Sequence, residues 1–151
     1  MHNNTLHTVY LSLGSNLGDR ERNLDEAILH IGKLIGAVVR QSAFLETEPW
    51  GFASPNRFLN AAVCLQTSLT PHQLLAETQA IERQLGRRQK TGPDGVYHDR
   101  PIDIDILLYD DLHVDEPDLI IPHPRMYIRP FVMEPLSEIM KEDNKNNQDN
   151  L

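Results

Sequence analysis

The sequence is short of positive charge and of cysteine. Its 151 residues include 14 Lys and Arg against 22 Asp and Glu, which gives a net charge of −8. A surplus of negative charge argues against broad binding to nucleic acid or to an anionic membrane, so a phosphate ligand needs a local basic cluster and a metal. Cys64 is the only cysteine, and the chain therefore cannot form an internal disulfide.

The sequence also lacks the signals of membrane insertion, of a phosphate-binding P-loop and of a zinc site. No apolar stretch approaches the roughly 20 residues that a membrane helix needs, and residues 1–8 do not resemble a secretory signal. The glycine turn over residues 14–19 lacks the Gly-Lys-Ser/Thr ending of a P-loop, and the histidines show no metal-ligand spacing. We therefore expect a cytoplasmic protein with neither a membrane nor a nucleic acid as its partner.

The spacing of apolar residues predicts one domain over residues 1–140 and a disordered, polar tail over 141–151. Strands are expected over 9–13, 38–47, 58–67, 100–109 and 119–121, and helices over 20–34 and 71–85. The order strand, helix, strand, strand, helix, strand is that of a ferredoxin-like βαββαβ sandwich, an α+β fold. Both helices would cover one face of an antiparallel sheet, which leaves the other face for a ligand or for C-terminal additions. We expect a monomer.

Both predicted helices carry start signals and an apolar stripe. Asp19 is a candidate N-cap, and so is Thr70, which Pro71 follows at the first helical position. The stripe expected to be buried is Leu24, Ala27, Ile28, Ile31 and Leu34 in the first helix, and Leu74, Thr78, Ile81 and Leu85 in the second. Gly36 and Gly86 are expected to end the two helices.

Residues 100–109 form a strand pattern that contains two acids. Side chains alternate between the two faces of a strand. Ile102, Ile104, Ile106 and Leu108 are therefore expected on the core face, and Asp103, Asp105, Leu107 and Tyr109 on the other. Two carboxylates roughly 7 Å apart repel each other unless cations lie between them, and Mg²⁺ suits oxygen ligands that leave positions open for phosphates. Asp103 and Asp105 are therefore candidate metal ligands, and the alternative is a solvated strand edge.

The stretch just before these acids is basic. Residues 87–101 show no clear period and contain two glycines and two prolines, and loops of this length are typically lids or disordered segments. Arg87 and Arg100 lie at its two ends. A basic segment next to a strand with paired acids predicts a Mg²⁺–polyphosphate site, with guanidiniums on the outer oxygens. A solvated basic run is the alternative.

Aromatic and amide side chains suggest a second ligand. The loop over residues 47–57 carries Trp50 and Phe52, and exposed aromatics there need a ligand or the core as a partner. In the strand that follows, Phe58 and Asn60 face away from its apolar side. A ring beside an amide can stack on a flat heterocycle and hydrogen-bond its edge, although an ordinary surface pair has the same pattern. His123, between two prolines, could donate to a phosphate or simply pack.

Several segments together resemble the 6-hydroxymethyl-7,8-dihydropterin pyrophosphokinase family of folate biosynthesis. They are Leu13–Gly18, Phe58–Val63, Ile81–Glu82 with Gly86–Arg87, Arg100–Leu107 and Ile121–Met126 running into Arg129 and Phe131. No single segment is decisive, but their order and spacing are highly specific. The resemblance extends from about Val9 to Ile139.

The resemblance implies that the chain transfers a pyrophosphoryl group from ATP to the hydroxymethyl group of a reduced pterin and releases AMP. It implies two Mg²⁺ at Asp103 and Asp105, and catalytic roles for these acids and for Arg87 and Arg100. The positions matching pterin-binding residues are Thr47, Glu48, Trp50, Phe58, Asn60, Asp103 and Phe131. The positions matching ATP-binding residues are Gln79, Glu82, Arg87, Arg100, Ile106, His123 and Arg129. The two loops would close over the substrates.

The implied reaction is an in-line displacement at the β-phosphorus of ATP, which depends mainly on positioning and charge neutralisation. Two other classes stay open on the sequence alone. A non-catalytic small-molecule sensor on the same fold would need no acid pair beside an arginine-rich segment. A Mg²⁺-dependent phosphohydrolase would use similar metal ligands but would leave Phe58 and Asn60 without a role.

Overall fold

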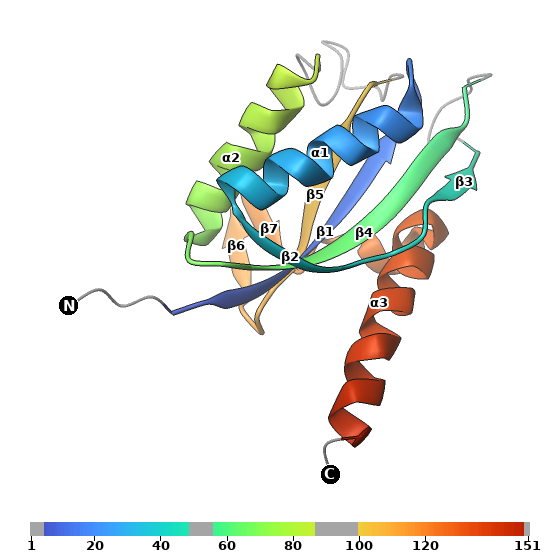
Figure 1. Cartoon of the computed structure of the whole chain (residues 1–151). Helices are drawn as coiled ribbons and strands as arrows, with labels where there is room; N and C mark the ends of the chain where they lie inside the picture. The colour runs from blue at the N-terminus through green and yellow to red at the C-terminus, as the bar shows by residue number, and fades with distance from the viewer. Residues whose placement is uncertain (1–4, 49–55, 87–99, 150–151) are drawn as a thin grey trace.

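The computed structural model describes residues 5–48, 56–86 and 100–149, with residues 141–149 described by their backbone. Its elements are β1 (His7–Ser15), α1 (Arg20–Leu34), β2 (Gly36–Gln41), β3 (Leu45–Thr47), β4 (Phe58–Thr67), α2 (Pro71–Gln84), β5 (Asp103–Tyr109), β6 (Val114–Glu116), β7 (Leu119–Ile121), the 3₁₀ turn η1 (Met126–Ile128) and α3 (Pro130–Asp149). Figure 1 shows α1 and α2 side by side over one face of the sheet, with α3 on the opposite side.

The main sheet has the strand order β2-β4-β1-β5, and β3 also pairs with β4. Every pairing in it is antiparallel. This order confirms the predicted ferredoxin-like α+β sandwich. The single strand expected over residues 38–47 is instead two strands, β2 and β3. Ser42 lies between them, where its hydroxyl accepts a hydrogen bond from the backbone N–H of Ala62 at 2.9 Å and interrupts the regular ladder.

Both predicted helix starts are confirmed. The Asp19 side chain accepts from Arg22 N at 3.1 Å, and Thr70 forms a capping box with Gln73. The predicted bounds of α1 are confirmed, but the expected burial of Leu34 is wrong, because Leu34 is 48% exposed while Ile35 is buried. The buried stripe moves to Ile35, four residues after Ile31, and Gly36 opens β2 rather than closing the helix. A Cβ at Gly36 would overlap the backbone carbonyl of Gln66.

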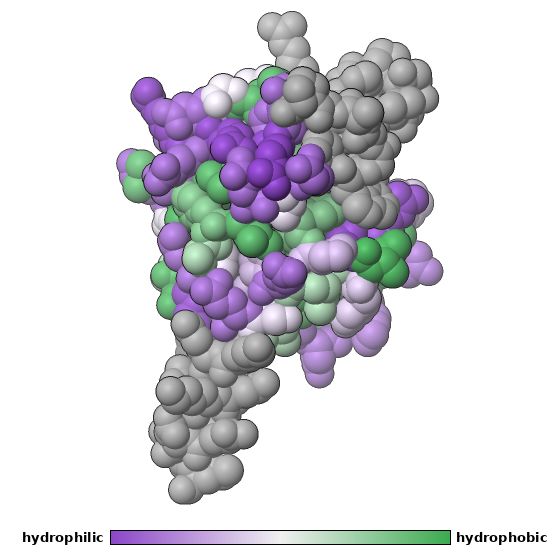
Figure 2. Space-filling model, turned by 90° about the vertical axis from the view of Figure 1, so that its right-hand side faces the viewer, coloured by the Kyte–Doolittle hydropathy of each residue, from purple (hydrophilic) through white to green (hydrophobic). Residues whose placement is uncertain are grey.

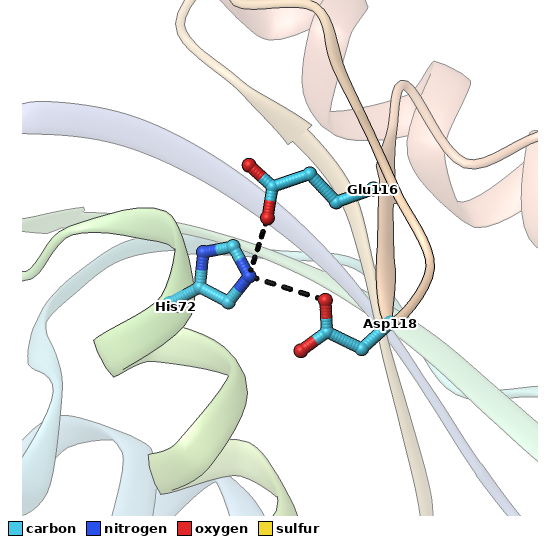
Figure 3. Close-up of side chains that lie close together, drawn as sticks. All are labelled: His72, Glu116 and Asp118. Carbon is cyan, nitrogen blue, oxygen red and sulfur yellow. Dashed lines mark hydrogen bonds and ion pairs between the residues drawn. The ribbon is translucent and has the colours of Figure 1, made fainter.

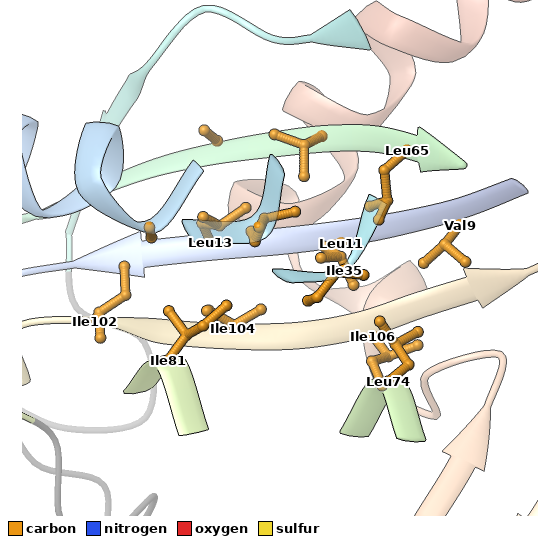
Figure 4. Close-up of a cluster of buried hydrophobic side chains, with 14 of the residues drawn as sticks. Val9, Leu11, Leu13, Ile35, Leu65, Leu74, Ile81, Ile102, Ile104 and Ile106 are labelled. Atoms are coloured by element: carbon orange, nitrogen blue, oxygen red, sulfur yellow. The ribbon is translucent and has the colours of Figure 1, made fainter. Parts of the chain in front are cut away.

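The core forms two layers, one on each face of the sheet. The larger layer lies under α1 and α2, and Figure 4 shows side chains of β1, β4 and β5 meeting those of the two helices. The smaller layer lies under α3 and is built from Ala62, Cys64, Leu107, Met126, Val132, Leu136 and Ile139. Each fully buried Leu or Ile stabilises the fold by roughly 1.5–3 kcal/mol. The face predicted to be free is thus covered by α3 at one end and open at the other.

Strand β5 keeps its predicted alternation as far as Leu107. Ile102, Ile104 and Ile106 belong to the larger core layer, as expected. Leu107 packs in the layer under α3, as the alternation predicts, but the next two residues are reversed. Leu108 also packs under α3, and Tyr109 enters the larger core. A register shift in the pairing with β1, between Tyr10 and Leu11, explains this, since an extra residue in one strand exchanges the two faces beyond it.

The C-terminal helix is longer than expected. Helix α3 begins at Pro130, passes Pro135 and continues to Asp149, where a disordered tail from Lys141 was predicted. The segment of residues 141–149 contains neither glycine nor proline to stop the helix, and its backbone continues the helix of the preceding residues. No helix within the described residues is long and apolar enough to cross a membrane.

The hairpin of β6 and β7 is attached to the start of α2 by charged side chains. His72 Nε2 lies 3.0 Å from Glu116 Oε2 and 3.2 Å from Asp118 Oδ1 (Figure 3). The hairpin leads directly into His123, whose backbone N–H donates to Leu107 O at 3.0 Å. This bond holds the segment after β7 against β5.

Candidate active site

A cavity of about 460 Å³ opens on the sheet face that α3 leaves uncovered. It is lined by Ser12, Leu13, Gly14, Thr47, Glu48, Phe58, Asn60, Arg100, Asp103, Asp105, His123, Pro124, Arg125, Arg129 and Phe131. Ten of these positions are ones that the sequence singled out. Figure 2 views the molecule from the side of β3 and α3, where apolar side chains cross the middle of the face and strongly hydrophilic ones gather above them.

Three neighbouring strands place the floor of this cavity. Gly14 of β1 pairs with Asn60 of β4 on one side and with Asp103 of β5 on the other. Two residues further along, Ser12 pairs with Asp105. Because alternate residues of a strand share a face, the amide and both carboxylates point into one cavity. Asp103 and Asp105 thus lie together, as their spacing predicted.

The acids have a cation beside them. Arg100 Nη2 lies 3.9 Å from Asp103 Oδ2, and these side chains are only 12% and 15% exposed. The guanidinium also lies over the ring of Phe58, 5.5 Å from its centroid. On the other side of the cavity, the guanidinium of Arg129 lies 5.8 Å from the centroid of the Phe131 ring. Each aromatic ring of the cavity therefore has an arginine against it.

Asn60 is buried and its amide is oriented by β3. Its Nδ2 donates to Thr47 Oγ1 at 2.7 Å and to Leu45 O at 3.4 Å. Because both donor positions are used within the fold, the carbonyl Oδ1 is the atom that remains to accept from a ligand. It lies beside Gly14, where a Cβ would come within 3.1 Å of it. The glycine therefore leaves room above the sheet at this point.

His123 presents one particular nitrogen. Its Nδ1 accepts from the backbone N–H of Arg125 at 3.2 Å. In the neutral imidazole the proton is then on Nε2, which makes Nε2–H a donor. The side chain lines the cavity close to Asp105. This arrangement suits an anionic ligand such as a phosphate.

A second hollow of about 270 Å³ adjoins the first. Its lining is mostly apolar and includes Leu75 of α2, Ile106 of β5 and the β6–β7 hairpin. Asp105, His123 and Pro124 line both hollows. The two spaces therefore meet at a carboxylate and an imidazole.

The remaining predicted residues lie elsewhere. Gln79 is exposed on α2, and Glu82 of the same helix is buried at 5% exposure behind β5. Trp50 and Arg87 lie outside the described residues, as do most of the two loops expected to close over substrates. The structure therefore places neither Gln79 nor Glu82 on the wall of either hollow.

Sequence reasoning missed five lining residues, namely Ser12, Leu13, Gly14, Pro124 and Arg125. The strand predicted over residues 9–13 extends to Ser15, so Gly14 belongs to the sheet rather than to a turn. The alternation of Ser12 with the buried Leu11 and Leu13 was the available signal for the open face. Which strand lies opposite depends on the pairing of β1 with β5, and the sequence alone does not show that register.

One further group of metal-type ligands occurs among the described residues. It consists of His72, Glu116 and Asp118, all of which are exposed. His72 Nε2 lies within hydrogen-bonding distance of both carboxylates (Figure 3), and these contacts account for their closeness.

A protein-family model described as 7,8-dihydro-6-hydroxymethylpterin-pyrophosphokinase (HPPK) matches residues 10–141. The chain belongs to this family. It is an ATP-dependent pyrophosphokinase of folate biosynthesis that transfers a pyrophosphoryl group to 6-hydroxymethyl-7,8-dihydropterin. The sensor and phosphohydrolase alternatives are accordingly not favoured.

Individual relatives agree with this family. The chain is 55% identical over 132 residues to 2-amino-4-hydroxy-6-hydroxymethyldihydropteridine pyrophosphokinase of Porphyromonas gingivalis. The match covers 87% of this chain and 89% of that protein. The Bacillus subtilis protein of the same name is 44% identical over 140 residues, covering 90% of this chain and 80% of that one.

Solved structures support the fold. The wild-type HPPK-DHPS protein of Plasmodium falciparum superimposes with a TM-score of 0.66 at 15% identity, over 87% of the pyrophosphokinase chain. The pyrophosphokinase spans 40% of that chain. It likewise spans 24% of an Arabidopsis thaliana relative named folate synthesis bifunctional protein, to which it is 42% identical. The same kind of domain thus occurs within larger proteins.

Proposed function

We propose that the pyrophosphokinase uses two Mg²⁺ held by Asp103 and Asp105. The donor set fits such ions, because both ligands are carboxylates on one face of β5 and line the cavity wall. When bound, Mg²⁺ neutralises phosphate charge and makes the pterin hydroxyl a stronger nucleophile. Arg100 lies beside Asp103 and offsets part of the negative charge of the acid pair before ligands arrive.

The two hollows suggest where the substrates bind. The larger cavity contains two aromatic rings, Phe58 and Phe131, together with the oriented amide of Asn60. This suits a flat pterin, stacked on the rings and donating from its edge to Asn60 Oδ1. Thr47 and Glu48 line the same cavity as Asn60 and are proposed to contact the edge of the pterin. The smaller, more apolar hollow next to Ile106 suits the nucleoside of ATP.

The observation that carries this proposal is that Asp105 and His123 line both hollows. Phosphates of an ATP molecule in the smaller hollow would then lie at the boundary with the pterin. The pterin oxygen would form a bond to the β-phosphorus and release its proton to solvent, while the bond from that phosphorus to the α,β-bridging oxygen breaks and AMP leaves with that oxygen. His123 Nε2–H and the guanidinium of Arg100 would stabilise the negative charge on the transferred group.

The other arginines complete the charge balance. Arg129 is buried beside Phe131 and is proposed to contact ATP phosphates. Arg87, outside the described residues, is proposed for the same purpose from its match to the family, and Trp50 for pterin binding. Gln79 on α2 remains a proposed ATP contact. For Glu82, burial against β5 supports a structural contribution to the site rather than direct contact with phosphates.

We further propose that the enzyme acts as a monomer in the cytoplasm. The residues that line the two hollows and are proposed to bind the substrates all belong to this chain. Its single cysteine, Cys64, is buried under α3 and cannot form an internal disulfide, which agrees with a reducing compartment. Light scattering at several protein concentrations tests the first part, and microscopy of a tagged chain tests the second.

The deciding experiment measures AMP release from ATP with and without 6-hydroxymethyl-7,8-dihydropterin. AMP is expected only when both the pterin and Mg²⁺ are present, and addition of a chelator should stop the reaction. Phosphate release without pterin would instead indicate a hydrolase. A protein that binds the pterin but forms no AMP under any condition would contradict the proposal.

A further inference from the structure

Asn16 is a buried polar residue to which no ligand contact has been assigned. It follows β1 directly and is only 2% exposed. Its hydrogen bonds reach two segments that are distant in sequence and that both lead into the active site. A buried amide stays stable only when its donors and acceptor are satisfied, so these bonds define its position closely.

The first segment is the one that carries Arg100. Asn16 Oδ1 accepts from the backbone N–H of Arg100 at 2.7 Å, and Asn16 N donates to Arg100 O at 3.0 Å. These two bonds join residues 84 positions apart in the chain. Together they fix both the place and the orientation of the Arg100 backbone, from which the guanidinium reaches Phe58 and Asp103.

The second segment is the entry to β4. Asn16 Nδ2 donates to Asn56 O at 3.3 Å, two residues before Phe58. The next carbonyl, that of Arg57, accepts from Arg20 Nη1 at 2.9 Å. Arg20 in turn bonds Glu46 of β3 at 2.9 Å. The start of β4 is therefore held from the same side of the fold as Arg100.

We propose that Asn16 is a positioning residue for pyrophosphoryl transfer. Its one amide sets the Arg100 backbone and the entry to Phe58 relative to each other, so that the cation and the aromatic ring meet in the cavity. This inference rests on the proposed contributions of Arg100 and Phe58. Asparagine is required because the backbone N–H of Arg100 needs an acceptor and the carbonyl of Asn56 needs a donor, and one side-chain amide provides both.

The contributions of the two side-chain hydrogen bonds of Asn16 can be separated by substitution. Asn16→Ala removes both side-chain bonds, and kcat is expected to fall about 10- to 100-fold, the cost of misplacing a catalytic group by about 1 Å. Asn16→Asp keeps the acceptor for Arg100 but loses the donor to Asn56, so it should retain most of kcat while raising the KM for the pterin. Asn23→Ala is the matched control, because the Asn23 amide bonds Leu17 O and Ser15 Oγ within the same turn.

A double-mutant cycle shows whether Asn16 acts through Arg100. In an Arg100→Ala enzyme, adding Asn16→Ala should change kcat less than twofold, because the group that Asn16 positions is already gone. Losses in kcat that multiply in the double variant would overturn the inference. So would an Asn16→Ala enzyme with unchanged kcat.

Amide hydrogen exchange tests the hydrogen bond from the Arg100 N–H to Asn16 independently of activity. The Arg100 N–H should be protected in the wild type and in Asn16→Asp, and should exchange faster in Asn16→Ala, with β1 amides unchanged. Faster exchange throughout the sheet would mean general destabilisation and would contradict a positioning role. If the wild type released no AMP, the proposed function would fail, and the exchange at Arg100 would still report whether this hydrogen bond exists.

Discussion

The backbone N–H of Ile104 donates to the carboxylate of Glu82 at 2.7 Å. Ile104 lies between Asp103 and Asp105 on β5, which is an edge strand of the main sheet. An edge strand has backbone groups without a neighbouring strand to pair with, and here a side chain from α2 provides the missing acceptor. The helix thereby fixes the strand at the level of the two acids.

We expect Glu82→Ala to lower the free energy of unfolding by about 1–3 kcal/mol, because the Ile104 N–H loses a buried acceptor. Urea denaturation measures this change. Glu82→Gln retains an acceptor oxygen and should lose less. Equal destabilisation by both substitutions would show that the charge, rather than the hydrogen bond, is what β5 requires.

Asp105→Ala should abolish AMP formation while the fold remains intact, with a loss of at least about 100-fold in kcat. The reason is that a carboxylate shared by both hollows is removed. AMP release and circular dichroism are the measurements. Asp111→Ala, in the exposed turn after β5, is the matched control and should keep full activity. An active Asp105→Ala enzyme would contradict the metal assignment.

Asn60→Ala should weaken pterin binding by about tenfold or more, about 1.4 kcal/mol, and leave ATP binding nearly unchanged. The amide carbonyl is oriented by Thr47 and Leu45 towards the larger cavity only. Calorimetry with each ligand in turn measures both affinities. Comparable losses for the two ligands would argue against an amide that contacts the pterin edge.

Gly14→Ala should weaken pterin binding without unfolding the chain. The added Cβ would lie 3.1 Å from Asn60 Oδ1 and 3.4 Å from a ring carbon of Phe58, in the floor of the cavity. Gly32→Ala is the matched control, because no atom lies within 4 Å of the new Cβ there. In helix α1 that change should stabilise the fold by about 0.4–1 kcal/mol. Unaltered pterin affinity in Gly14→Ala would place the ligand elsewhere.

Tyr109 should make stability fall at alkaline pH. Burial raises the pKa of Tyr109 above its ordinary value of 10.0, and the charge of Asp110 raises it further. The unfolded chain therefore loses this proton first, so the contribution is complete below pH 10.0 and is lost as the pH rises through the raised folded pKa. Urea midpoints across this range should fall less steeply for Tyr109→Phe than for the exposed-residue control Tyr127→Phe.

The parts of the site that follow from local periodicity were predictable from the sequence. Asp103 and Asp105 share a face because they are two residues apart, and the same holds for Phe58 and Asn60. The apolar side of β4, opposite Phe58 and Asn60, was also correctly predicted to face the core, as were the caps Asp19 and Thr70. In each case the information lies within one turn or one strand of the residue concerned.

The parts that depend on pairing between distant segments were not predictable in the same way. Gly14 lies between Asn60 and Asp103 only because β1 pairs with both β4 and β5. The partner of Asn16 is 84 residues away. Strict alternation placed Tyr109 beside the acids, whereas the irregular pairing near Leu11 turns it into the larger core.

That irregularity divides β5 into two stretches with separate tasks. Up to Ile106 the strand places Asp103 and Asp105 in the wall of the cavity, and Leu107 and Leu108 then provide the surface on which the C-terminal helix packs. The side chains that pack under α3 can therefore be substituted without turning the carboxylates away from the cavity. Deleting the extra residue, Leu107, would restore regular alternation and would leave Leu108 under α3 and Tyr109 in the larger core.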